Sequence, residues 1–183
     1  MSARELPYDV IADTFARTLA GVRDDQWSLP TPCEDWDVAQ LVGHVVATHW
    51  RVYALCGEPG RPADGTEIDL RDAFTEATDA MRRAAHDPVL SQVEVQGRAG
   101  TQTFAQLVGG LLSLDTICHS WDLARATGQD ETLDPDAVDI AFERLRAVDD
   151  VVRVPGGFAE AVPSAPDADT QTRFLNFAGR RTS

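Results

Sequence analysis

Two acids and a histidine interrupt the apolar face of one long helix-forming segment, and this interruption constrains the fold more than any other feature. The apolar residues of the segment lie three and four positions apart, at Phe104, Leu107, Val108, Leu111, Leu112 and Cys118. This is the spacing of a buried helix face. Asp115, His119 and Asp122 occupy the same face. Because an unpaired carboxylate is costly to bury, a buried Asp is normally protonated, paired or bound to a metal.

Asp115 and His119 lie four positions apart, which brings their side chains together on one side of a helix. Hydrogen-bonded pairs at this spacing are common in proteins without a metal, so the spacing alone does not decide between the two readings. The core-facing position strengthens the case for a metal until the two readings carry equal weight. A tetrahedral catalytic zinc site has three protein ligands and one open position. The sequence therefore predicts a further ligand from a neighbouring helix.

Two histidines of an earlier predicted helix are candidates for the third ligand. His44 and His49 flank the apolar stripe of the segment 38–56 on opposite sides, and helical periodicity does not choose between them. His86 lies near the end of another predicted helix, where it suits a solvated helix C-terminus better than a buried site.

Helical periodicity and cap residues predict an all-α fold. The expected helices cover residues 6–23, 38–56, 69–85, 103–127, 135–149 and 168–178. Residues 89–100 alternate in part like a strand, but no partner strand is evident, so we expect an extended loop there. Helices of this number and length predict a single domain over residues 1–183, a four-helix bundle with additional short C-terminal helices.

The overall composition argues against several classes of partner. The 183 residues are 43% hydrophobic and 25% charged, as in ordinary soluble globular proteins. A formal net charge of -14 repels phosphate backbones and anionic lipid surfaces, so nucleic acid and membrane are not expected partners. The three separated cysteines indicate neither a disulfide framework nor a thiolate zinc site. With no signal-like start or membrane-length apolar run, the sequence predicts a cytoplasmic protein.

The motif around the acid and histidine resembles that of a known family. The run Asp115-Thr-Ile-Cys-His119-Ser-Trp121-Asp122-Leu-Ala-Arg125-Ala-Thr-Gly128 is similar to the D-x3-H-x-W-D-L-A-R-A-x-G signature of actinobacterial proteins in the DinB/YfiT-like metalloenzyme superfamily. These proteins are related to the N-terminal domain of mycothiol-dependent maleylpyruvate isomerase. Supporting matches lie at Trp27, 30–36, 41–44 and 173–180. The resemblance spans residues 7–181.

The resemblance implies a four-helix bundle that holds a divalent metal through one histidine and a later acid-x3-histidine pair. Carried over by position, the ligands are His44, Asp115 and His119, with zinc as the first choice and nickel or iron as alternatives. Two histidines and a carboxylate are also the ligand set of non-haem iron oxygenases. The isomerase has Glu where Asp115 stands, which weakens any transfer of the isomerase reaction. A homodimer is implied by the resemblance alone.

The resemblance also implies a low-molecular-weight thiol, mycothiol, as co-substrate. Two neutral imidazoles and one carboxylate leave a divalent cation with a net positive charge and an open face, where it acidifies a thiol or water. We therefore expect a metal-dependent, thiol-using transferase or isomerase that acts on a small electrophile. Asp122 and Arg125 would orient the substrate or the thiol. A metal-dependent hydrolase and a non-catalytic metal-binding helical module are the alternatives that the sequence leaves open.

Overall fold

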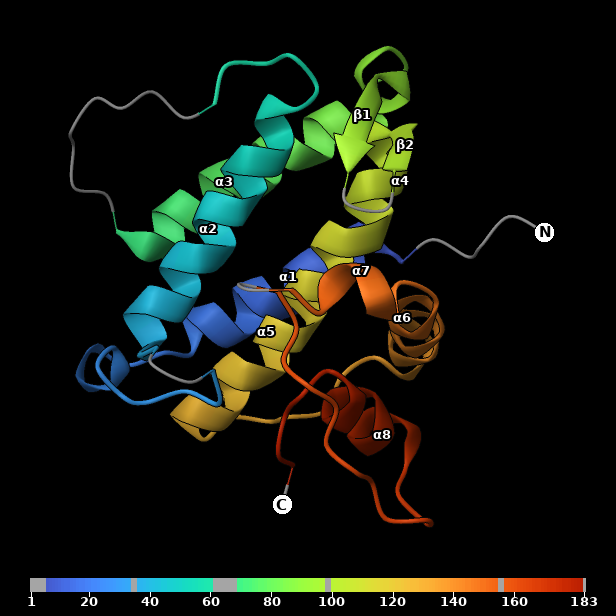
Figure 1. Cartoon of the computed structure of the whole chain (residues 1–183). Helices are drawn as coiled ribbons and strands as arrows, with labels where there is room; N and C mark the ends of the chain where they lie inside the picture. The colour runs from blue at the N-terminus through green and yellow to red at the C-terminus, as the bar shows by residue number, and fades with distance from the viewer. Residues whose placement is uncertain (1–5, 34–35, 61–68, 98–99, 155–156, 183) are drawn as a thin grey trace.

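The computed structural model describes residues 6–33, 36–60, 69–97, 100–154 and 157–182, and it is mostly helical (Figure 1). The longer helices are α1 Tyr8–Ala20, α2 Val38–Ala54, α3 Leu70–His86, α5 Ser113–Thr127, α6 Pro135–Ala147 and α8 Thr170–Phe177. The shorter ones are η1 Asp24–Gln26, η2 Leu90–Gln92, α4 Phe104–Leu107, η3 Val108–Leu112 and α7 Asp149–Val152. The expected mainly helical class is confirmed. No helix among the described residues is both long enough and apolar enough to span a membrane.

Cap residues set where the main helices begin. At the start of α2 the carboxylate of Asp37 accepts a hydrogen bond from the backbone N–H of Gln40, whose side chain accepts one from the backbone N–H of Asp37. Asp134 accepts from the backbone N–H of Ala137 at the start of α6, with Pro135 at the first helical position. Both starts agree with the sequence prediction.

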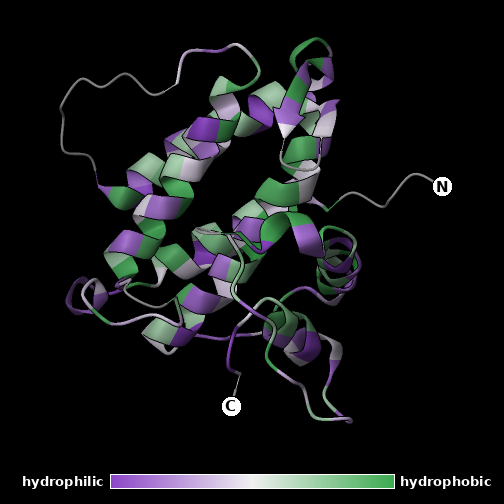
Figure 2. Ribbon diagram, viewed as in Figure 1, coloured by the Kyte–Doolittle hydropathy of each residue, from purple (hydrophilic) through white to green (hydrophobic). Residues whose placement is uncertain are grey.

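Helices α1, α2, α3 and α5 form the part of the fold that carries the candidate site. Helix α1 packs against α5 and α3, and α2 packs against α3 and α5 (Figure 1). Phe15 of α1 meets Phe74 of α3 with ring centroids 4.6 Å apart. Hydrophobic residues alternate with hydrophilic ones around each of these helices, as Figure 2 shows. The packing therefore holds α2 beside α5, the two helices that bear the predicted metal ligands.

The segment predicted as one helix over 103–127 is divided. Between α4 and α5 the chain makes the wider, π-helical turn η3, in which Gly110 has φ -115° and ψ -108°, outside the helical region. Two consecutive glycines, Gly109 and Gly110, lower the cost of leaving the helix. The irregular turn leaves the carbonyl of Gly109 to accept a hydrogen bond from the backbone N–H of Leu6 at 2.9 Å. A local widening therefore precedes the site helix directly.

The expectation of an unpaired extended loop over 89–100 was wrong. Strand β1 Glu94–Gly97 pairs antiparallel with β2 Gly100–Thr103, with Glu94 opposite Thr103. The partner was missed because β2 is short, lacks apolar residues and runs directly into the cap of α4. Val95, at the centre of β1, is buried and explains why the hairpin stays on the fold.

Alanine substitutions at two glycines test the backbone conformation, because we expect them to change stability in opposite directions. A Cβ added at Gly43, inside α2, would meet no atom within 4 Å. Gly179 has φ +86°, and a Cβ there would lie 2.7 Å from the Cβ of Ala159. We expect Gly43→Ala to stabilise the protein by about 0.5–1 kcal/mol and Gly179→Ala to destabilise it by more than about 1 kcal/mol, measured by urea unfolding. Equal effects of the same sign would contradict this assignment.

Candidate metal centre

The structure brings His44, Asp115 and His119 together. His44 lies on α2, and Asp115 and His119 lie one turn apart on α5. The Nε2 atom of His44 is 3.6 Å from Oδ2 of Asp115, and Nε2 of His119 is 3.5 Å from Oδ1 of the same carboxylate. One ligand atom from each of the three residues lies within 4.8 Å of the other two. The two imidazole rings meet edge to face with centroids 5.1 Å apart.

These distances fit a divalent cation. Zinc bonds of 2.0–2.2 Å in a tetrahedral arrangement separate neighbouring ligand atoms by roughly 3.4 Å, close to the two distances from Asp115. Oδ2 of Asp115 is buried, and among the described residues no donor lies within hydrogen-bond distance of it, since Nε2 of His44 is 3.6 Å away. Because buried carboxylate oxygens are normally satisfied, an oxygen without a hydrogen-bond donor is suited to bind a cation. The side chains of His44 and Asp115 are 24% and 25% exposed, so an ion has an approach from solvent.

Charges inside the site favour a cation as well. Burial alone would raise the pKa of Asp115, but the neighbouring His119 and His44 side chains outweigh burial and hold that pKa below its usual range. Burial opposes the charge of His119, whereas the charge of Asp115 and the hydrogen bonds of Asp115, Asp122 and Cys33 raise its pKa. The ring of His119 therefore lies between two carboxylates, those of Asp115 and Asp122, whose negative charge favours a cation.

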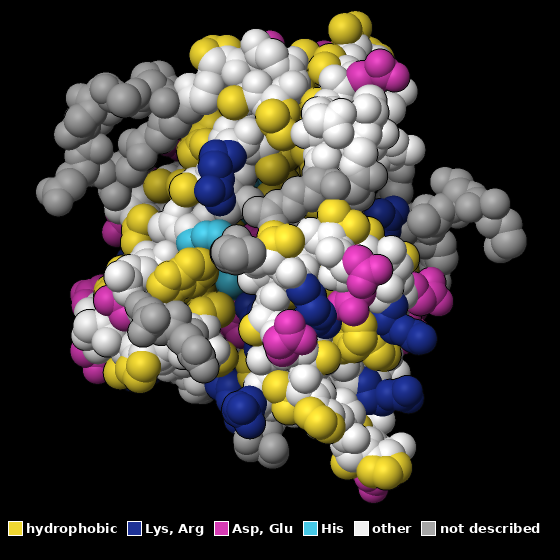
Figure 3. Space-filling view, viewed as in Figure 1, with side chains coloured by type: hydrophobic (Ala, Val, Ile, Leu, Met, Phe, Trp, Pro, Cys, Tyr) yellow, Lys and Arg dark blue, Asp and Glu magenta, His cyan; other side chains and the backbone are white. Residues whose placement is uncertain are grey.

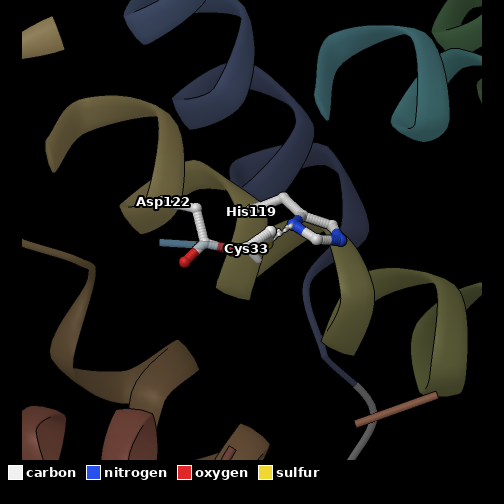
Figure 4. A group of neighbouring side chains, drawn as sticks. All are labelled: Cys33, His119 and Asp122. Carbon is white, nitrogen blue, oxygen red and sulfur yellow. Dashed lines mark hydrogen bonds and ion pairs between the residues drawn. The ribbon is translucent and has the colours of Figure 1, made fainter. Parts of the chain in front are cut away.

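Asp122 fixes the direction of the His119 ring. Nδ1 of His119 lies 3.0 Å from Oδ2 of Asp122. Since an ionised carboxylate only accepts hydrogen bonds, Nδ1 carries the proton and donates it. Figure 4 shows one ring nitrogen of His119 turned toward Cys33 and Asp122 and the other pointing away. The arrangement leaves Nε2 on the side of Asp115, as in metal-binding histidines that are oriented by a carboxylate.

Arg180 compensates the charge of Asp122, whose side chain is fully buried. The guanidinium donates from Nε to Oδ1 at 3.1 Å and from Nη2 to Oδ2 at 2.7 Å, a two-point contact. Burial by itself would raise the pKa of Asp122, but Arg180 and the hydrogen bond from His119 lower it. Sequence reasoning gave Arg180 no role, because it lies far along the chain and carries no local periodic signal.

Cys33 lies close to His119 and Asp122, and these three residues form a second candidate group. Its thiol donates to Oδ2 of Asp122 at 3.2 Å and lies 3.8 Å from Nδ1 of His119. Cys33, His119 and Asp122 are themselves close enough to hold a metal ion. The guanidinium of Arg180, however, already binds both oxygens of Asp122 and would repel a cation there. We therefore favour the group built on Asp115.

The other polar candidates lie outside the cluster. Arg125 forms an ion pair with Glu131 at 3.0 Å, and its guanidinium lies 4.9 Å from the centroid of the Trp121 ring, so its charge is already engaged. Cys118 is buried, and burial raises the pKa of its thiol to about 12. Its expected inert character fits this environment. His86 is exposed on α3 and faces Asp9 at 3.4 Å.

His49 lies apart from the ligand cluster and gives a pH-dependent stability. Its Nδ1 donates to the carbonyl of Val45 at 2.8 Å, and its buried Nε2 has no hydrogen-bond partner in the part of the chain that the structure describes. Burial lowers the pKa of His49 from 6.5 to about 4, against the opposing effect of the Val45 carbonyl. The unfolded chain therefore takes up this proton first as the pH falls, and stability is lost between pH 6.5 and 4.

We expect this single histidine to contribute about 3 kcal/mol of acid destabilisation across that window. Urea unfolding of the wild type and of His49→Leu at several pH values measures the contribution. The variant should lose less stability between pH 7 and 5 than the wild type does. His86→Leu, at an exposed histidine, is the matched control and should keep the wild-type slope. Identical slopes for all three proteins would contradict the assigned burial of a neutral His49.

His44, Asp115 and His119 line a cleft of about 1130 Å³. Trp36 forms part of its wall, with its ring centroid 4.6 Å from that of His44. Figure 3 shows histidine side chains at the bottom of a hollow bordered by hydrophobic side chains. A cleft of this size holds a small-molecule ligand next to the cluster.

Comparisons with known proteins show the family to which the chain belongs. A family model described as the mycothiol maleylpyruvate isomerase N-terminal domain matches residues 8–124. Two uncharacterized proteins of Mycobacterium tuberculosis, MT0763 of strain CDC 1551 / Oshkosh and Rv0738 of strain H37Rv, are each 34% identical over 177 residues. The aligned residues cover 89% of this chain and 91% of each relative. No solved structure gives a significant match. The span of the family model includes the three candidate ligands and ends before Arg180.

Proposed function

Because the chain belongs to the mycothiol maleylpyruvate isomerase N-terminal domain family, we propose that it is a metal-dependent enzyme that uses a low-molecular-weight thiol. The metal is zinc, the thiol is mycothiol, and the reaction is a transfer to, or an isomerisation of, a small electrophile. The enzyme works in the cytoplasm as one domain, in which α1, α2, α3 and α5 form a four-helix bundle around the site.

One observation carries the proposal. Among the described residues the buried Oδ2 of Asp115 has no hydrogen-bond partner, although Nε2 of His44 lies 3.6 Å from it and Nε2 of His119 lies 3.5 Å from Oδ1 of the same carboxylate. A purely structural ion pair would be expected to satisfy both carboxylate oxygens. A divalent cation held by His44, Asp115 and His119 accounts for the orphaned oxygen, for the convergence of the ligand atoms and for the opening to the cleft.

The metal would supply electrostatic activation, since a bound divalent cation lowers the pKa of a thiol or a water that reaches it. The protein holds the metal-binding side chains in position. Asp122 holds the His119 ring by its Nδ1–H, and Arg180 keeps Asp122 ionised. Both are positioning residues, because they act through His119. Trp36 covers the His44 ring and limits the access of bulk water from that side.

Arg125, predicted to orient substrate or thiol, has a narrower role in this proposal. Its ion pair with Glu131 and its contact with Trp121 hold the guanidinium in place. Arg125 then contributes to the wall of the cleft rather than to binding of the reacting group.

A thiol-dependence assay tests the proposed function. Zinc-loaded full-length protein is incubated with mycothiol and a panel of epoxides, unsaturated carbonyl compounds and esters. The proposal expects turnover that requires both zinc and thiol, and that Asp115→Asn abolishes. Asp9→Asn, at a carboxylate that faces His86, is the matched control and should retain activity. Turnover of esters without thiol would instead identify a hydrolase, and an inactive protein that still binds zinc would identify a metal-binding module.

A further inference from the structure

The hydroxyl of Thr48 on α2 is oriented differently from the hydroxyls of the neighbouring helices. Every serine and threonine of α1, α3 and α5 donates its hydroxyl to a backbone carbonyl four or five residues earlier, as Thr75 does to Arg71 at 2.9 Å. This bond to the preceding turn is common for hydroxyls inside helices. Thr48, by contrast, forms no hydrogen bond to a backbone carbonyl among the described residues. Its proton is therefore available to a group outside the helix backbone.

Two side chains of the same helix face contact this hydroxyl. Nη2 of Arg51 donates to Oγ1 of Thr48 at 2.7 Å, and Oγ1 lies 3.5 Å from Nε2 of His44. All three residues line the cleft. Because a guanidinium only donates, Arg51 occupies a lone pair of Oγ1 and leaves the proton of the hydroxyl unused. Within the described part of the chain, Nε2 of His44 is then the one hydrogen-bond partner left for that proton.

A metal on His44 would remove this last acceptor. Nε2 of His44 lies 3.6 Å from Oδ2 of Asp115, so it is the nitrogen that would bind the ion. A nitrogen that binds a metal uses its lone pair and cannot also accept a hydrogen bond. The hydroxyl of Thr48 would then have a proton to donate and no acceptor among the residues that the structure describes. It therefore suits an acceptor atom that enters from the cleft.

The charge beside this hydroxyl favours an anionic acceptor. Arg51 is exposed, and no carboxylate of the described residues forms an ion pair with it. Two other arginines that line the cleft are already held by carboxylates, Arg125 by Glu131 and Arg180 by Asp122. In a chain with a formal net charge of -14, an unpaired guanidinium in the cleft attracts an anion. The sulfur of a thiolate is an anionic acceptor of this kind.

We propose that Thr48 is a further binding residue for the thiol co-substrate. Its hydroxyl donates a hydrogen bond to the thiolate sulfur beside His44, and Arg51 is a positioning residue that holds the hydroxyl away from its own helix. This inference rests on the proposed function, because it takes a thiol as co-substrate and a metal on His44. It adds the contact that the α2 side of the cleft makes with the sulfur.

Thiol binding to the cobalt-loaded protein tests this proposal. The full-length protein is freed of metal with a chelator and loaded with Co²⁺. It is then titrated with 2-mercaptoethanol while the sulfur-to-cobalt charge-transfer absorption is recorded. Thr48→Val keeps the branched shape and removes the hydroxyl. We expect it to weaken thiol binding roughly tenfold or more, because the lost hydrogen bond is to a charged group.

Two further variants control for shape and for the loss of a hydroxyl in general. Thr48→Ser keeps a hydroxyl and should retain most of the thiol affinity. Thr75→Val, at an exposed threonine of α3 that bonds to its own helix, is the matched control and should bind the thiol as the wild type does. Cobalt affinity, measured against a competing chelator, should be the same in all of these proteins, because Thr48 is not a metal ligand.

Arg51→Met tests whether the arginine acts through the hydroxyl. It should weaken thiol binding in the wild-type background and weaken it less in the Thr48→Val background, because both changes act on the same hydrogen bond. Equal effects of Arg51→Met in the two backgrounds would overturn the positioning role of Arg51.

Two results would overturn the inference alone. One is equal thiol affinity of Thr48→Val and Thr75→Val, and the other is a loss of cobalt affinity in Thr48→Val, which would make Thr48 a metal ligand. A wild-type protein that binds no Co²⁺, or that binds Co²⁺ but no thiol, would refute the proposed function and this inference with it. Because cobalt binding and thiol binding are measured separately, the two kinds of failure are distinguishable.

Discussion

We expect His119→Ala to abolish stoichiometric binding of a divalent cation and His86→Ala to leave it intact. Removing the His119 ring takes away a proposed ligand and leaves His44 and Asp115 alone. Loss of a residue that only orients a ligand already costs about 10–100-fold in metal affinity, so loss of a ligand should cost more than about 100-fold. Elemental analysis after purification, followed by zinc titration against a competing chelator, measures both stoichiometry and affinity.

The two variants are matched because each replaces a histidine of a helix by alanine. His86 is 69% exposed and pairs with Asp9, so its removal leaves the cluster untouched. Far-ultraviolet circular dichroism of both variants checks that the helices remain. A folded His119→Ala protein that keeps one tightly bound ion would contradict the proposed ligand set.

Arg180→Met should be the most destabilising single substitution at the site. Asp122 has no exposed side-chain surface, and Arg180 contacts both of its oxygens. Breaking one side of a buried ion pair leaves an uncompensated charge and costs about 3–5 kcal/mol. Urea unfolding at neutral pH measures the loss. Arg181→Met, at the neighbouring exposed arginine, is the matched control and should change stability by less than about 0.5 kcal/mol.

A double variant separates charge burial from packing. If the cost of Arg180→Met comes from the stranded Asp122 carboxylate, then adding Asp122→Asn should recover part of the lost stability. The double variant should still bind zinc more weakly than the wild type, by about 10–100-fold, because the His119 ring loses its orientation. A stability loss for Arg180→Met that matches that of Arg181→Met would contradict the assigned pair.

Local patterns predicted most of the helices. Cap residues such as Asp37 and Asp134 and the three-and-four spacing of apolar residues are short-range signals, and they placed α2 and α6 to within two residues of their observed bounds. The same spacing identified Asp115 and His119 as neighbours. The break at Gly109 and Gly110 was missed, because an apolar pattern on either side of two glycines still reads as one helix.

Helical periodicity could not predict how side chains are placed by the packing of separate segments. His44 and His49 flank the same stripe, and only the packed fold shows that His49 donates to its own helix while His44 faces Asp115. The family resemblance had selected His44, in agreement with the geometry. Cys33 and Arg180 meet Asp122 from segments 89 and 58 residues away, so no local spacing relates them.

X-ray absorption spectroscopy of the zinc-loaded protein tests the central claim most directly, because it reports which atoms surround the ion. A site built from His44, Asp115 and His119 predicts a first shell of nitrogen and oxygen at about 2.0–2.2 Å, with no sulfur. The spectrum of Cys33→Ser should then equal that of the wild type. A sulfur neighbour at about 2.3 Å that disappears in Cys33→Ser would place the metal at Cys33, His119 and Asp122 instead, and would contradict this account.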